Sequence, residues 1–64
     1  MKFTTSRQYS ETAAWMRYSA TTAKGTVHID KRAGQFLVTL VGTDAGQVFT
    51  TLAAAKAHAA SLIG

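Results

Sequence analysis

The segment Gln35–Val41, QFLVTLV, decides how the rest of this chain can fold. It is the densest run of β-branched, aromatic and large aliphatic residues in the sequence, a composition typical of a central strand. Side chains alternate between the two faces of a strand. One face therefore carries Phe36, Val38 and Leu40. The other face carries Gln35, Leu37, Thr39 and Val41.

The residues before this segment predict a partner strand. Thr26–Lys31, TVHIDK, alternates in the same way, with Val27 and Ile29 on the face that we expect to be buried. Lys31–Gly34 would close a hairpin between the two strands, with Gly34 supplying a positive φ. Two strands joined by such a hairpin predict an antiparallel sheet.

The residues after it predict a helix over Leu52–Ile63, with Thr50 or Thr51 as the N-cap. This segment is rich in alanine, a strong helix former. Its apolar stripe at helical spacing consists of Leu52, Ala55, Ala59, Leu62 and Ile63. We expect this stripe to cover the sheet face that carries Val27, Ile29 and Val38.

Ala13–Thr22 can be a strand or a helix. As a strand, it places Met16, Tyr18 and Ala20 on one face and Trp15, Arg17, Ser19 and Thr21 on the other. As a helix, it would have Ser10 as the N-cap and end at Gly25. The aromatic residues and the paired threonines favour the strand.

The expected fold is therefore one α+β domain over residues 1–64, a three-stranded antiparallel sheet packed on one C-terminal helix. In the alternative form of this fold, a turn at residues 42–46 leads into a short fourth strand at Gln47–Phe49. Residues 1–12 are polar and show no apolar period, so we expect a polar arm or a short edge segment there.

Composition narrows the class of protein. A chain of 64 residues without cysteine has no disulfide framework, and its small core contributes only about 3–5 kcal/mol. A homodimer or a larger partner is the expected source of further stability. Seven Lys and Arg against three Asp and Glu give a net charge of +4, which favours polyanions or an acidic host protein as partners. We expect a soluble, cytoplasmic protein with no membrane segment.

Catalytic chemistry is not expected. The carboxylates are Glu11, Asp30 and Asp44, and their positions provide no acid–base pair. His28 and Asp30 lie two apart on one strand face, but no nucleophile motif accompanies them. We expect no metal, no cofactor and no enzymatic activity.

The sheet face away from the helix is the expected binding surface. Its aromatic and cationic residues suit stacking on bases and contacts with phosphates. The predicted nucleic-acid site comprises Trp15, Arg17, Lys24, His28, Lys31 and Arg32. The alternative is a protein interface at Trp15, Leu37, Thr39 and Val41. For Trp15, a place in the core remains a third interpretation.

Gly46–Lys56, GQVFTTLAAAK, resembles the strand-to-helix junction of the arm-type DNA-binding domains of phage integrases and their AP2-like relatives, at Phe49, Thr51 and Ala55. That resemblance implies a three-stranded sheet that lies in the DNA major groove. It makes Arg17, Lys31 and Arg32 the candidates for contact with the DNA. The chain is also similar to the end of double-stranded-RNA-binding domains, through FLVTLVG and Ala55–Ala60. It lacks their paired lysines, so DNA is favoured over RNA.

Two functions follow as hypotheses. The first is a non-enzymatic nucleic-acid-binding accessory protein that uses the open sheet face and the hairpin cations. The second is a phage- or plasmid-encoded inhibitor or adaptor, similar to anti-CRISPR proteins, that covers the surface of a host protein.

Overall fold

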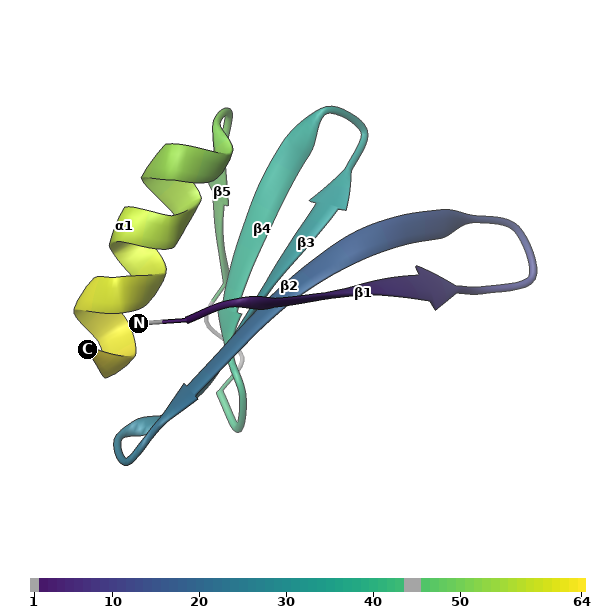
Figure 1. Cartoon of the computed structure of the whole chain (residues 1–64). Coiled ribbons are helices and arrows are strands. Elements are labelled where there is room, and N and C mark those ends of the chain that lie inside the picture. The colour runs from purple at the N-terminus through teal and green to yellow at the C-terminus, as the bar shows by residue number, and fades with distance from the viewer. Residues whose placement is uncertain (1, 44–45) are drawn as a thin grey trace.

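The computed structural model describes residues 2–43 and 46–64. The strands are β1 (Thr4–Tyr9), β2 (Ala14–Thr22), β3 (Gly25–Arg32), β4 (Gln35–Leu40) and β5 (Gly46–Phe49), and helix α1 (Leu52–Ile63) follows them. The five strands form one antiparallel sheet in chain order, and α1 lies on one face of it (Figure 1). The α+β class and the C-terminal helix are therefore confirmed.

The expected number of three or four strands is wrong, because the described residues form five. The short strand expected at Gln47–Phe49 is present as β5. The additional strand is β1, in the region expected to be a polar arm or a short edge segment. All six residues of β1 pair with β2, from Thr4 opposite Ser19 to Tyr9 opposite Ala14. An edge strand that buries little needs no apolar alternation, so its sequence pattern stays polar.

The segment expected to be either strand or helix is strand β2. Its register places Tyr18 opposite Ile29 and Ala20 opposite Val27, so the apolar residues of β2 share the face covered by α1. Ala20 is fully buried, and Tyr18 packs at the border of the core. Burial of this face stabilises the extended form over a helix, whose apolar stripe would be narrow.

The core lies between α1 and the central strands. Its buried side chains are Ala20, Val27, Ile29, Val38, Ala55, Ala59 and Ile63. Ala55 and Ala59 have 0% exposure, so small side chains on the helix meet larger ones on the sheet. Leu62, expected on the buried stripe, is instead 38% exposed, because Ile63 takes the position over the sheet. The core is small, as the chain length predicts.

Hydrogen bonds hold both ends of α1. The side chain of Thr51 accepts a hydrogen bond from the backbone N–H of Ala54 at 3.2 Å, so Thr51 rather than Thr50 is the N-cap. At the other end, Thr22 donates to the backbone oxygen of Ile63, and Lys24 Nζ donates to that of Gly64 at 3.2 Å. The β2–β3 turn is thereby tied to the end of the helix.

The β3–β4 hairpin turns through two residues with positive φ, Ala33 at 53° and Gly34 at 75°. The expected positive φ at Gly34 is confirmed, and Ala33 adopts the same region without being glycine. Two consecutive positive φ values define the tight hairpin turn whose twist matches the strands. The turn expected over residues 42–46 includes residues 44 and 45, which lie outside the described part of the chain.

Candidate nucleic-acid interface

The sheet face opposite α1 carries an aromatic and charged group at one end of β2 and β3. Trp15 and Arg17 are on β2, and Asp30 and Arg32 are on β3. Arg17 and Asp30 are direct cross-strand partners, which brings their side chains together. We call these four residues the open-face cluster. Strand alternation predicted that Trp15 and Arg17 share one face, and the structure confirms it.

Asp30 is the centre of the open-face cluster. Trp15 Nε1 donates to Asp30 Oδ1 at 3.0 Å, and Arg17 Nε donates to the same oxygen at 2.6 Å. The Asp30 side chain is 13% exposed and that of Arg17 is 29% exposed, so the ion pair is largely shielded from water. One of the predicted phosphate-binding cations is thus already paired with a carboxylate.

Trp15 lies on the open face and is half-buried, so the interpretation that places it in the core is wrong. The guanidinium of Arg32 lies over the indole, with Cζ 4.5 Å from the ring centroid. A cation over the face of a tryptophan is attracted by the negative ring face, and arginine can stack there as a flat group. Arg32 therefore covers the indole of Trp15, and Asp30 fixes the indole through its N–H; we call this contact the Trp15–Arg32 stack.

The remaining predicted cations do not join this cluster. Lys31 faces the helix side of the sheet, where Nζ lies 5.9 Å from the ring centroid of Phe36. The reason is that consecutive residues of a strand point to opposite faces, so Lys31 and Arg32 cannot share one. Lys24 lies in the β2–β3 turn, about 23 Å along the strand from Lys31 at 3.3 Å per residue. The expected patch of hairpin cations is therefore divided among three places.

His28 lies on the open face at the middle of β3. Its Nδ1 is 2.8 Å from the hydroxyl oxygen of Ser19, its cross-strand partner. Asp30 is engaged by Trp15 and Arg17, so His28 and Asp30 bond different partners. The pair does not form a histidine–carboxylate couple. His28 is therefore a separate polar residue next to the open-face cluster.

Asp30 is the residue of this cluster that sequence reasoning did not include. A two-residue turn at Ala23 and Lys24 would have paired Arg17 with Asp30 directly. The sequence pattern did not set the length of this turn, and a different length would have paired Arg17 with another residue. The turn length was thus the missing signal.

Apolar side chains on the same face lie beside the cluster, toward β5. Leu37 on β4 pairs with Val48 on β5, and they are 36% and 52% exposed. A pocket of about 230 Å³ separates them from the cluster, lined by Asp30, Arg32, Ala33, Gln35, Leu37 and Val48. Of the expected protein-interface residues, Val41 is 52% exposed and Thr39 is half-buried. Val48 was not predicted, because its pairing with Leu37 needs the β4–β5 register.

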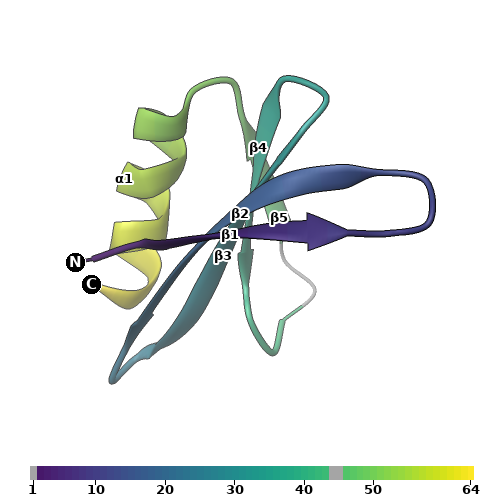
Figure 2. The same cartoon turned by 45° about the vertical axis from the view of Figure 1, so that its right-hand side comes forward.

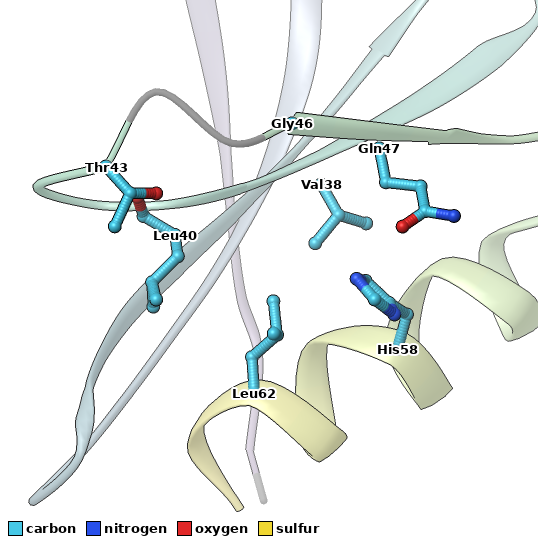
Figure 3. Close-up of a pocket in the computed structure, with 7 residues that line it drawn as sticks. All are labelled: Val38, Leu40, Thr43, Gly46, Gln47, His58 and Leu62. Carbon is cyan, nitrogen blue, oxygen red and sulfur yellow. The ribbon is translucent and has the colours of Figure 1, made fainter.

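A second pocket, of about 150 Å³, opens between the sheet and α1 (Figure 3). The side chains of Val38, Leu40 and Leu62 line it together with Gln47 and His58. The His58 ring is 5.1 Å from that of Phe49, centroid to centroid. Among residues 2–43 and 46–64, no group of three His, Asp or Glu side chains could hold a metal ion.

In comparisons with known proteins, no family model, no curated protein and no solved structure matches this chain. The resemblance of residues 46–56 to integrase DNA-binding domains therefore stays a prediction. Within the described residues, no helix has the length and apolar character needed to cross a membrane.

Proposed function

We propose that this protein is a non-enzymatic nucleic-acid-binding accessory protein whose open sheet face holds the nucleic acid. The observation that carries the proposal is the stack of Arg32 on Trp15, 4.5 Å from guanidinium carbon to ring centroid. Arginine guanidinium planes stack on bases and also bind phosphates, so an anchored Trp15–Arg32 stack can extend into a base.

Rigidity supports this function. Trp15 is fixed by its hydrogen bond to Asp30, which Arg17 also holds, so the stack is oriented before any ligand binds. Preorganisation lowers the entropy lost on binding. The excess of seven Lys and Arg over three Asp and Glu supplies the long-range attraction to phosphates. With no cysteine in the chain, we place the protein in the cytoplasm.

The test uses Trp15 itself as the probe, because it is the only tryptophan of the chain. Purified protein is titrated with single-stranded and duplex oligonucleotides of DNA and of RNA at low salt while tryptophan emission is recorded. Stacking of a base on the Trp15–Arg32 stack should change the emission, and rising salt should reverse the change. Failure of every DNA and RNA probe to bind at low salt would refute the proposal.

A second candidate function rests on the exposed pair Leu37 and Val48 beside a pocket of about 230 Å³. Exposed apolar groups next to a pocket suit a protein partner. This candidate is the phage- or plasmid-encoded inhibitor or adaptor. It predicts capture of one host protein that survives nuclease treatment and is lost in Leu37→Ser. Capture that disappears with nuclease supports the nucleic-acid function instead.

A further inference from the structure

The helix side of the sheet carries a second group of cations, next to the region that α1 covers. Cross-strand pairing places Arg7, Met16, Lys31 and Phe36 in one row across β1 to β4. Arg7 and Lys31 are exposed. Helix α1 packs mainly on β3, β4 and β5, and the turn end of the β1–β2 hairpin extends away from it (Figure 2). The end of this face that carries Arg7 and Lys31 therefore has no covering element among the described residues.

Lys56 brings a third cation to the adjacent part of this face, from the middle of α1. Its Nζ lies 5.4 Å from the ring centroid of Phe3 and 5.8 Å from that of Tyr18. The rings of Phe3 and Tyr18 pack at the border of the core, so they fix the ammonium group beside the sheet. We call this surface the helix-side ledge, defined by Phe3, Arg7, Tyr18, Lys31, Phe36 and Lys56.

The charge of the helix-side ledge is not balanced by nearby carboxylates. Of the acidic side chains in the described residues, Asp30 is on the opposite face and Glu11 is in the β1–β2 turn. The ledge thus has three cations, whereas the open-face cluster has two arginines and one aspartate. Cations beside aromatic rings are the combination that binds phosphates and stacks bases. The composition is complementary to nucleic acid rather than to an apolar protein surface.

The two surfaces meet at the end of β3. Lys31 belongs to the helix-side ledge and Arg32 to the open-face cluster, and the two are consecutive in the chain. Immediately beyond them the chain turns through Ala33 and Gly34 into β4. Toward this end of the sheet the β1–β2 and β3–β4 hairpins diverge (Figures 1 and 2). A ligand that reaches both surfaces by the shortest path crosses the β3–β4 turn.

We infer that the ligand is single-stranded nucleic acid, which passes over the β3–β4 turn and contacts Arg32 and Trp15 on one face and the helix-side ledge on the other. This inference rests on the proposed function. A duplex has a persistence length of about 50 nm, so it cannot bend around one end of a small sheet. A single strand is flexible enough to follow both faces, and its unstacked bases are free to stack on protein side chains.

The experiment compares two exposed lysines near opposite ends of the β3 strand. Lys31→Gln and Lys24→Gln each remove one positive charge, but only Lys31 is on the helix-side ledge. Binding to a single-stranded oligothymidylate and to a duplex is measured across a salt series. Circular dichroism establishes that both variants keep the native fold, and Arg7→Gln provides a second ledge variant on another strand.

We expect Lys31→Gln to weaken single-strand binding by roughly threefold to tenfold and to lower the slope of log affinity against log salt by about 0.7. Arg7→Gln should act in the same direction, and Lys24→Gln should have a clearly smaller effect. Arg32→Gln should weaken single-strand binding as well, because the strand contacts both faces. The duplex should respond to changes on one face alone.

Two results would overturn the inference while leaving the proposed function standing. One is equal weakening by Lys31→Gln and Lys24→Gln, which would mean that only net charge matters. The other is a duplex that binds as tightly as the single strand and loses affinity with both Lys31→Gln and Arg32→Gln. Loss of all binding in the wild-type protein would instead refute the proposed function itself.

Discussion

Arg17 donates from Nε to Oδ1 of Asp30 at 2.6 Å, directly across strands β2 and β3. The same oxygen accepts the indole N–H of Trp15 at 3.0 Å. One carboxylate therefore orients the tryptophan of the open-face cluster and at the same time neutralises one of its two arginines. Asp30 orients the side chains of the proposed site, but its negative charge weakens the attraction of the site for phosphates. Removing that charge should therefore lower the stability of the protein and raise its affinity for nucleic acid.

Asp30→Asn should raise the affinity for nucleic acid and lower stability. The amide oxygen can still accept from Trp15, but the variant frees Arg17 and removes a negative charge from the site. We expect a rise of about 0.7 in the salt slope for a single strand, and a loss of about 1 kcal/mol in the free energy of unfolding. Glu11→Gln is the matched control, with the same change in charge in the β1–β2 turn. Equal gains in both variants would contradict a local role.

Val38→Asp should unfold the domain. Val38 is 2% exposed between the sheet and α1, so a carboxylate placed there loses its hydration in a mainly apolar core. Val48→Asp is the control, since it makes the same change at a valine that is 52% exposed. Circular dichroism and urea unfolding should show an unfolded protein for Val38→Asp and a native spectrum for Val48→Asp. A cooperative native transition in Val38→Asp would disprove the packing of the core.

Ala33→Asn should stabilise the protein. Ala33 has a φ of 53°, a region that is costly for alanine and that asparagine tolerates, and Asn-Gly is the preferred sequence for such a turn. We expect a gain of about 1 kcal/mol in the free energy of unfolding, measured by urea titration. Ala23→Asn, in the β2–β3 turn, should bring no such gain, because Ala23 is not among the positive-φ residues. A destabilised Ala33→Asn would contradict the described turn.

The elements that could be predicted are those with a burial pattern. Strand β4 and helix α1 face each other through apolar residues, so alternation and helical spacing identified both. Strand β1 could not be found in this way, because its residues at the sheet edge are mostly exposed. What holds β1 is pairing of its backbone with β2, and backbone hydrogen bonds leave little trace in side-chain composition.

The candidate site was predictable only in part, for a reason of register. Alternation alone placed Trp15 and Arg17 on one face, whereas the contact of Arg17 with Asp30 depends on the length of the turn between their strands. Alternation also places Lys31 and Arg32 on opposite faces. The predicted site grouped them because both are positively charged. Lys56 belongs to the ledge through tertiary packing against Phe3 and Tyr18, which no local pattern contains.

Self-association remains a prediction of the small core and the exposed apolar pair. We expect a dimer or higher assembly at micromolar concentration, with Leu37 and Val48 at the contact, because burying them would add apolar area that seven core residues alone do not supply. Sedimentation velocity of the wild-type protein and of Val48→Lys is the measurement. The variant should shift toward monomer. A wild-type protein that stays monomeric throughout this range would remove the prediction.

The Trp15–Arg32 stack should show different energetic signatures for its two members. Trp15→Ala should weaken nucleic-acid binding by roughly 1–3 kcal/mol without changing the salt slope, because a stacking contact releases no counterion. Arg32→Gln should lower both the affinity and the slope, because Arg32 carries the charge. The double variant should lose less than the sum of the single losses, since Arg32 over the indole couples the two side chains. Isothermal titration at two salt concentrations measures all three quantities. Strictly additive losses would mean that the two residues bind independently, and an unchanged slope in Arg32→Gln would remove Arg32 from the phosphate contacts.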